Sequence, residues 1–173
     1  MKRLQKNFFT RDVLEVAPDL LGKYLVRRFD DESVQEFLIT EVEAYRGQED
    51  LACHASKGRT PRTDIMYHEG GHVYVYLIYG MYWMLNIVTA TKDVPQAVLI
   101  RGIEGFDGPG KLTKSLQIDK SFYGENLVSS ERLWIESSEK LSEIKIKSSP
   151  RIGIDYAGEE YKNKPWRYLL CNK

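Results

Sequence analysis

The segment Val73–Asn86 constrains the fold more than any other part of the chain. It reads V-Y-V-Y-L-I-Y-G-M-Y-W-M-L-N, so β-branched and aromatic residues run through it and only Gly80 interrupts them. Residues of these types favour strands, and glycine readily takes the positive φ of a tight turn. The segment therefore predicts either two strands with a turn at Tyr79 and Gly80, or one strand that ends in a projecting tip.

Other segments predict further, mostly antiparallel strands. Lys23–Phe29 and Val34–Tyr45 are rich in β-branched and aromatic residues and flank a charged turn, which is typical of a hairpin. Ala97–Ile103 predicts another strand, and Arg151–Ile154 and Trp166–Cys171 predict the last ones. Together they indicate a mixed α+β fold.

Helices and loops are expected between these strands. Arg11–Leu21 has apolar residues at helical spacing, but Pro18 should break the helix into one or two turns on either side. Pro109–Ile118 opens with proline and predicts a second helix. The polar segment Arg46–Gly71 predicts a long functional loop, and the serine-rich, charged segment Ser137–Ser149 predicts a mobile one.

Size and composition indicate one domain over residues 1–173. A hydrophobic content of 42% is enough to bury a core. No run of eighteen apolar residues and no apolar signal-peptide centre occurs, which predicts a cytoplasmic protein without membrane contact. Cys53 and Cys171 lack metal-ligand spacing and predict two reduced thiols.

The charge balance argues mildly against a nucleic-acid partner. Lysine plus arginine equals aspartate plus glutamate at 25 each, whereas phosphate binding usually requires a basic surface. The charges are segregated, however, because Leu51–Arg62 carries three basic residues and no acid. Further basic residues follow the G-P-G turn or lie near the C-terminus: Lys111, Lys114, Arg151, Lys162, Lys164 and Arg167. Only the fold can show whether they form one basic face.

A group of catalytic candidates lies in Ile39–Tyr45, which reads I-T-E-V-E-A-Y. In a strand, alternation sends Glu41, Glu43 and Tyr45 to the same face. A carboxylate beside an aromatic ring is suited to acid–base chemistry. From these residues alone, a solvated strand glutamate is the favoured interpretation of Glu43, and Glu41 is expected to be structural.

Five motifs together resemble the alkyladenine (3-methyladenine) DNA glycosylase family. They are the two segments above, A-V-L-I-R at Ala97–Arg101, G-P-G-K-L at Gly108–Leu112 and P-R-I-G-I at Pro150–Ile154. They occur in the family's order, and the resemblance extends from about Phe8 to about Trp166. It implies a single domain with a curved, mostly antiparallel sheet, flanking helices and a protruding aromatic β-hairpin.

The resemblance also implies a function. The chain would be a monofunctional, monomeric glycosylase without cofactor or metal. It would flip alkylated or deaminated purines out of double-stranded DNA and hydrolyse the N-glycosidic bond, in the cytoplasm or at a prokaryotic nucleoid. The competing reading is a non-catalytic nucleic-acid or nucleotide-binding module, which would need the aromatic hairpin but not Glu43.

Matched positions carry the implied roles. Glu43 corresponds to the carboxylate that deprotonates the attacking water, which Arg101 and the main-chain carbonyl of Ile152 help to position. Tyr79 corresponds to the wedge that fills the vacated base stack, and Asn86 would clash with the 2-amino group of guanine. The positions matching the base pocket are Tyr45, His54, Tyr76, Met81, Asn86 and Leu99.

Backbone phosphates are expected to meet Lys111, Arg59 and Arg62. The position of Lys111 in G-P-G-K would also suit a lyase amine, but the family is monofunctional and phosphate contact is therefore the expectation. A helix-hairpin-helix reading of G-P-G is weaker, because the second glycine turn is missing.

The segment His68–His72 reads H-E-G-G-H and matches the zinc-protease pattern H-E-x-x-H. That pattern binds zinc only when a helix aligns both histidines on one face. Two adjacent glycines cost about 2 kcal/mol in a helix, and a β-type run follows. We therefore expect neither a helix nor a metal site at this position.

Overall fold

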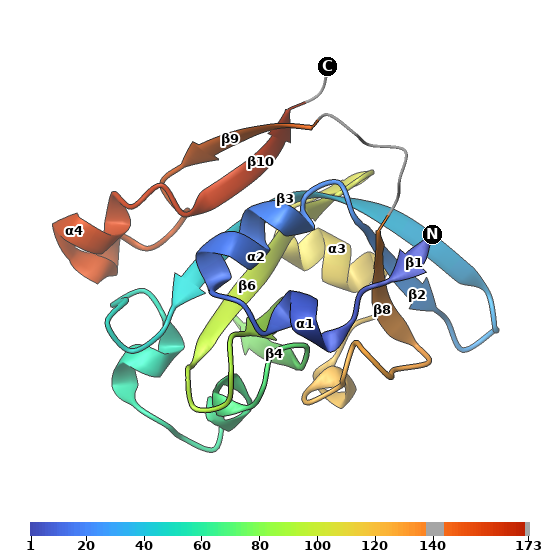
Figure 1. Ribbon diagram of the computed structural model, residues 1–173, viewed down its shortest axis with the longest axis horizontal. Helices are drawn as coiled ribbons and strands as arrows, with labels where there is room; N and C mark the ends of the chain where they lie inside the picture. The colour runs from blue at the N-terminus through green and yellow to red at the C-terminus, as the bar shows by residue number, and fades with distance from the viewer. Residues whose placement is uncertain (138–143, 172–173) are drawn as a thin grey trace.

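The computed structural model describes residues 1–137 and 144–171 (Figure 1). Within them, ten strands form one open antiparallel sheet with the main order β1-β8-β2-β3-β6-β5-β4. Their bounds are β1 Lys2–Arg3, β2 Tyr24–Arg28, β3 Val34–Arg46, β4 Val73–Ile78, β5 Tyr82–Thr89, β6 Gln96–Ile103, β7 Phe106–Asp107, β8 Leu133–Ser137, β9 Lys145–Ser149 and β10 Arg167–Cys171. The predicted α+β class is confirmed.

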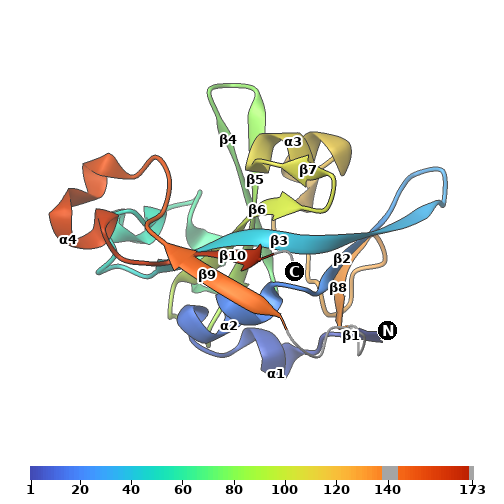
Figure 2. The same cartoon turned by 90° about the horizontal axis from the view of Figure 1, so that it is seen from above.

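Strand β3 organises the sheet, because its two halves pair with different strands. Its first half pairs with β2, as the predicted hairpin requires, and its second half lies between β6 and β10. Figure 2 shows β3 as a long curved ribbon crossing the molecule. Within the second half, Glu43 lies opposite Leu99 on β6 and Arg167 on β10.

The hairpin β4–β5 confirms the two-strand reading of the aromatic segment. Its register pairs Ile78 with Tyr82, and the turn residues Tyr79 and Gly80 take φ values of +51° and +66°. Figure 2 shows the hairpin projecting away from the rest of the sheet. Tyr79 is therefore placed at the tip of a protruding element.

Four short α-helices and four 3₁₀ helices accompany the sheet, and α4 packs against η4. Figure 2 places α1 and α2 on one side of it and α3 on the other. Their bounds are α1 Lys6–Phe9, α2 Val13–Leu20, α3 Pro109–Ser115, α4 Gly158–Lys162, η1 His54–Lys57, η2 Asp64–Tyr67, η3 Lys120–Phe122 and η4 Asp155–Ala157, all within the described residues.

Helix α2 corrects one prediction, because it continues through Pro18. Asp12 caps its first turn by accepting a hydrogen bond from the Leu14 N–H at 2.9 Å. Four α2 side chains are buried against the sheet, at Val13, Val16, Ala17 and Leu20. The helix ends two residues after Pro18, so this burial and the cap are enough to offset one missing N–H donor.

Two predictions near the C-terminus were wrong. Within the predicted loop Ser137–Ser149, Lys145–Ser149 forms strand β9, while residues 138–143 lie outside the described part. The β9 side chains are mostly exposed, so its sequence lacks the buried alternation typical of a strand. Arg151–Ile154 is not a strand, because Arg151 turns inward and Gly153 has a φ of +72°.

The main core lies between the sheet and helices α2 and α3. A smaller apolar cluster surrounds the start of β4 and the 3₁₀ helices η1 and η2, formed by Cys53, Ala55, Ile65, Met66, Tyr67, Tyr74, Val88 and Ala97. The two 3₁₀ helices give the predicted loop Arg46–Gly71 a packed interior. Among the described helices, none has the length and apolar character needed to cross a membrane.

The H-E-G-G-H segment is not helical, as predicted. His68 follows η2, and Gly71 has a φ of +105°. A Cβ atom added to Gly70 would lie 2.2 Å from the Phe9 carbonyl oxygen. The segment therefore needs glycine because the N-terminal backbone approaches it closely, and its two histidines are not aligned on a helix face as the zinc-protease motif requires.

Gly70→Ala should lower the free energy of unfolding by about 1–3 kcal/mol, since overpacking forces backbone shifts of this cost. Urea denaturation measures the effect. Gly102→Ala is the control and should cost less. Its Cβ would first meet the Thr40 hydroxyl at 3.0 Å, which is a side-chain atom and not part of the backbone. Equal losses for the two variants would contradict the close approach at Gly70.

Candidate active site

Glu43 lies on β3 with its side chain fully buried, at 0% exposure. The Ile152 N–H donates to Glu43 Oε1 at 2.7 Å, and the Tyr45 hydroxyl donates to Oε2 at 2.7 Å. Arg101 Nε lies 3.7 Å from Oε1. The predicted alternation therefore brings Glu43 and Tyr45 into direct contact, with Arg101 beside them.

The protonation of Glu43 is set by opposing effects. Burial raises the pKa of Glu43 above its ordinary value, while Arg101 and the hydrogen bonds from Ile152 and Tyr45 partly offset that rise. Burial also raises the pKa of Tyr45 well above its usual range, so this phenol stays protonated and donates. A carboxylate with few water contacts and a raised pKa is suited to accepting a proton.

Arg101 bridges the two acidic residues of β3. Its Nε lies 3.0 Å from Glu41 Oε1, and Arg167 Nε lies 2.6 Å from the same oxygen. Glu41 therefore holds two guanidinium groups next to Glu43, which agrees with its expected structural role. Arg101 is both an ion-pair residue and a neighbour of the candidate catalytic group.

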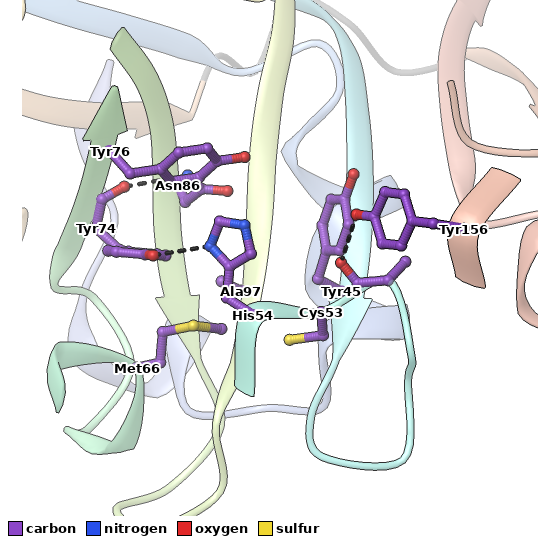
Figure 3. Close-up of a pocket in the computed structure, with 10 residues that line it drawn as sticks. Tyr45, Cys53, His54, Met66, Tyr74, Tyr76, Asn86, Ala97 and Tyr156 are labelled. Carbon is purple, nitrogen blue, oxygen red and sulfur yellow. Dashed lines mark hydrogen bonds between the residues drawn. The ribbon is translucent and has the colours of Figure 1, made fainter. Parts of the chain in front are cut away.

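Beside Glu43 lies a pocket with mainly aromatic walls (Figure 3). Figure 3 shows Tyr74, Tyr76 and His54 on one side and Tyr45 with Tyr156 on the other. The lining residues are Tyr45, Ala52, Cys53, His54, Met66, Tyr74, Tyr76, Asn86, Ala97 and Tyr156.

Four of the six predicted pocket residues line this space: Tyr45, His54, Tyr76 and Asn86. The buried Leu99 lies in register with Glu43 and Asn86 on the neighbouring strands. Met81 is 64% exposed next to the hairpin turn. In this structure Met81 thus belongs to the exposed hairpin tip.

His54 is held as a neutral ring. A hydrogen bond joins its Nδ1 to the Tyr74 hydroxyl at 2.9 Å, and its ring centroid lies 4.5 Å from that of Tyr76. Burial, together with Arg62 and Lys57, lowers the pKa of His54 to about 4. At neutral pH the imidazole therefore presents an uncharged face to the pocket.

This low pKa makes His54 a source of acid sensitivity. Its pKa rises from about 4 in the folded protein to an ordinary 6.5 on unfolding, so the unfolded state binds more protons in between. Stability is therefore lost as the pH falls from 6.5 to 4. Between pH 7 and pH 4 the free energy of unfolding should fall for both proteins. We expect the fall to be about 2 kcal/mol smaller for His54→Asn than for wild type, after a discount for partial exposure. Urea denaturation at several pH values tests this, and parallel curves would contradict it.

The hairpin tip and helix α3 lie together. Tyr79 is 88% exposed, an unusual position for a large aromatic ring. The Thr113 hydroxyl of α3 donates to the Trp83 carbonyl of β5 at 2.8 Å, so α3 packs against the hairpin. Lys111 is exposed in the first turn of α3, on the element that packs against the hairpin.

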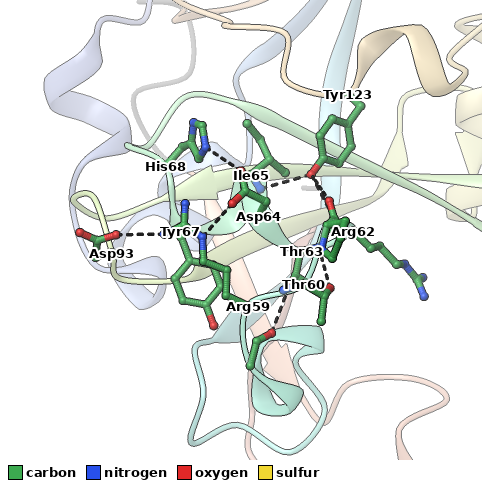
Figure 4. A network of polar contacts seen from close by, with 12 residues as sticks. Arg59, Thr60, Arg62, Thr63, Asp64, Ile65, Tyr67, His68, Asp93 and Tyr123 are labelled. Atoms are coloured by element: carbon green, nitrogen blue, oxygen red, sulfur yellow. Dashed lines mark hydrogen bonds and ion pairs between the residues drawn. The ribbon is translucent and has the colours of Figure 1, made fainter.

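The two predicted phosphate-binding arginines have different surroundings. The Arg62 guanidinium lies 5.1 Å from the centre of the Tyr76 ring, beside the pocket. Arg59 instead contacts Asp64 at 2.7 Å and Asp93 at 3.5 Å. Figure 4 shows Arg59 inside this polar network, whereas the Arg62 side chain extends away from it. Arg62 is thus better placed for a ligand in the pocket.

Sequence reasoning missed three residues around the pocket. Tyr156 is 69% exposed, lines the pocket, and donates its hydroxyl to the Ala52 carbonyl at 3.3 Å. Asp50 and Arg151 form a buried ion pair. Arg151 belongs to the P-R-I-G-I motif, but no local pattern indicates its partner. Because Arg151 is buried and Arg167 contacts Glu41, neither belongs to an exposed basic face.

Metal ligands do not gather in the described part of the chain. No group of three His, Cys, Asp or Glu side chains there is arranged to hold an ion. His68 contacts Asp64 at 3.0 Å, and the His72 Nδ1 donates to the Glu69 carbonyl at 2.7 Å. Cys53 is buried and Cys171 exposed, and both are free thiols.

An aromatic pocket beside a buried carboxylate, with an exposed tyrosine on a nearby hairpin, is consistent with an enzyme that acts on a nucleobase outside the duplex stack. The sequence matches the methylpurine-DNA glycosylase family over residues 7–107 and 106–173. The chain therefore belongs to the methylpurine-DNA glycosylase family, and its enzymatic class is that of the DNA-3-methyladenine glycosylases.

Individual relatives agree along nearly their whole length. A protein of Clostridium novyi is 43% identical over 98% of this chain and 96% of its own, and one of Methanocella arvoryzae is 44% identical over 99% and 94%. A protein of Legionella pneumophila is 41% identical over 98% and 95%. All three are named "Putative 3-methyladenine DNA glycosylase".

Proposed function

We propose that this chain is a monofunctional glycosylase that flips alkylated or deaminated purines out of duplex DNA and hydrolyses their N-glycosidic bond. One observation carries the proposal: the Glu43 carboxylate is fully buried at the edge of an aromatic pocket and touches a pocket wall through Tyr45. A binding module has no need of a buried acid beside an arginine, so this observation favours an enzyme.

Base capture begins at the hairpin. Unstacking a nucleotide costs a few kcal/mol, and the Tyr79 ring inserts into the gap and offsets part of that cost. Lys111 and Arg62 contact the backbone phosphates on either side. The DNA partner is a duplex that contains a damaged purine, and one copy of the chain binds it without a cofactor.

The flipped base stacks between Tyr45 and the pair formed by Tyr76 and His54. Each stacking contact is worth about 1–3 kcal/mol. A neutral His54 receives cationic and neutral purines alike, because it adds no positive charge to the pocket. Asn86 donates to the Tyr74 carbonyl at 3.2 Å, which keeps its side chain in place to exclude the 2-amino group of guanine.

Hydrolysis follows from the position of Glu43. An ionised carboxylate has about four acceptor positions, and the contacts from Ile152 and Tyr45 occupy two of them. Because the Glu43 side chain is fully buried, the pocket wall shifts to admit the attacking water. Glu43 takes a proton from this water, which Arg101 and the Ile152 carbonyl help to orient. The water oxygen bonds to the anomeric carbon with inversion, and the base leaves with the electrons of the broken C–N bond.

The nature of the lesion decides how easily the base leaves. A cationic base such as 3-methyladenine departs as a neutral molecule. A neutral base such as hypoxanthine requires a proton on the purine ring, and no second acid is assigned to supply it. We therefore expect faster release of cationic purines.

Base release from a defined duplex tests the proposal. Oligonucleotides containing hypoxanthine or 1,N6-ethenoadenine are incubated with excess protein, and free base is quantified by mass spectrometry. Release with the sugar–phosphate backbone left intact is the expected result. Binding without release from either lesion would support the binding-module reading, and strand cleavage through a lysine-bound sugar would contradict the monofunctional assignment.

A further inference from the structure

A buried ion pair that plays no part in the reaction above lies directly behind the pocket. Arg151 Nη1 and Nη2 donate to the two Asp50 carboxylate oxygens at 2.6 and 2.9 Å, and both side chains are fully buried. Asp50 also accepts from the backbone N–H groups of Arg46 at 3.0 Å and Ala52 at 3.1 Å. Hydrogen bonds therefore occupy almost all acceptor positions of the Asp50 carboxylate.

Stability alone is a poor explanation for such a pair. Removing two charges from water costs several kcal/mol per ion, and well-packed apolar residues often do as well or better. What a bidentate pair supplies is a fixed geometry between two segments. Here the segments are far apart in sequence and both carry residues of the site.

Each partner is joined to site residues through the backbone. On one side, Arg151 is followed by Ile152, whose N–H contacts Glu43 at 2.7 Å. Arg151 Nη1 also donates to the Ala44 carbonyl at 3.0 Å, next to Glu43. Its guanidinium lies 4.8 Å from the centre of the Tyr45 ring, a pocket wall.

On the other side, Asp50 shapes the loop that carries His54. Its carbonyl accepts from the Cys53 N–H at 2.8 Å, and its carboxylate holds the Ala52 N–H. Both Ala52 and Cys53 line the pocket. The pair thus connects β3, the His54 loop and the Ile152 segment.

We propose that the Asp50–Arg151 ion pair is a positioning device that fixes the Ile152 N–H against Glu43 and tunes the charge on that carboxylate. This inference rests on the proposed function, and neither residue touches the substrate. Arg151 favours the ionised form of Glu43, as Arg101 does. If Asp50 is neutralised, the positive charge of Arg151 acts on Glu43 without compensation. If Arg151 is removed, the negative charge of Asp50 does so instead.

Opposite effects are therefore expected from Asp50→Asn and Arg151→Gln. An unpaired Arg151 should move the low-pH limb of the rate profile to lower pH, and loss of Arg151 should move it to higher pH. Both variants should release base about 10–100-fold more slowly, since an ångström of misplacement can cost about 10²-fold. Affinity for the lesion duplex should change far less, and circular dichroism confirms folding.

Glu125→Gln is the matched control. Glu125 contacts Arg132 at 2.8 Å in a half-buried pair away from the pocket. Its release rate and pH midpoint should equal those of wild type. If Arg151→Gln does not fold, the same measurements are made on Asp50→Asn and Arg151→Lys. Asp50→Asn is nearly isosteric with wild type.

Hydrogen exchange of the Ile152 amide supplies a readout that is independent of activity. Wild type should protect this amide, and Asp50→Asn should lose most of the protection. Unchanged protection, or an unchanged pH midpoint in an active variant, would overturn the positioning role. A wild type that releases no base would contradict the proposed function instead, and amide exchange would still decide the inference.

Discussion

Glu43→Gln should reduce base release about 10²–10⁴-fold, the usual contribution of a general base, while lesion-duplex affinity stays within a few-fold of wild type. Glutamine keeps the shape of the buried side chain. Its amide oxygen can accept from the Ile152 N–H, and its amide nitrogen can donate to the Tyr45 oxygen. The variant therefore keeps the shape and most contacts of the side chain but lacks its negative charge and its ability to accept a proton.

Single-turnover release and equilibrium binding, measured on the same lesion duplex, separate the two effects. Glu41→Gln is the matched control, because Glu41 shares the β3 face and contacts Arg101 but not the Ile152 N–H. We expect a smaller loss there, arising from a less ordered Arg101. Equal release by wild type and Glu43→Gln would rule out the assigned role.

Tyr79→Ala should have the second-largest effect, and it should act on capture of the flipped base. The exposed ring contributes little to the fold, since it is 88% exposed. A stacked ring is worth about 1–3 kcal/mol, so affinity for lesion duplex should fall about 5–150-fold. Binding to undamaged duplex, which depends on phosphate contacts, should fall much less.

A fluorescent base placed beside the lesion reports the flipped state directly. Tyr79→Phe retains the ring and serves as the control, with near-wild-type capture expected. If Tyr79→Ala weakens lesion and undamaged duplex to the same extent, the hairpin is a general contact and not a wedge.

The strands with a buried face were predictable from local alternation. The β4–β5 hairpin and β3 follow from their β-branched and aromatic residues and from the single turn at Gly80. Strand β9 was not, because its side chains are mostly exposed and its hydrogen bonds depend on a distant partner, β10. Pro18 is the opposite case, because a local signal is present but misleading: burial of α2 against the sheet overrides the helix-breaking effect of the proline.

The site was predictable only in part, for a related reason. The contact between Glu43 and Tyr45 follows from period-two geometry within one strand. The pocket roles of His54, Tyr76 and Asn86 depended on the family resemblance. The contact between Asp50 and Arg151 spans 101 residues, and no short-range pattern carries it. The contact at Ile152 was expected through its carbonyl, whereas the structure adds one from its N–H to Glu43.

Hydrolysis by the proposed mechanism requires an ionised Glu43 that acts as a base beside the pocket. The pH dependence of single-turnover release from a 3-methyladenine duplex, whose cationic base needs no added proton, measured between pH 5 and pH 8, tests this most directly. Because burial raises the pKa of Glu43, the wild-type rate should climb with pH through a midpoint above the ordinary glutamate value of 4.5, and Glu43→Gln should lose this limb. The same rising limb in both proteins, or none in wild type, would contradict the account.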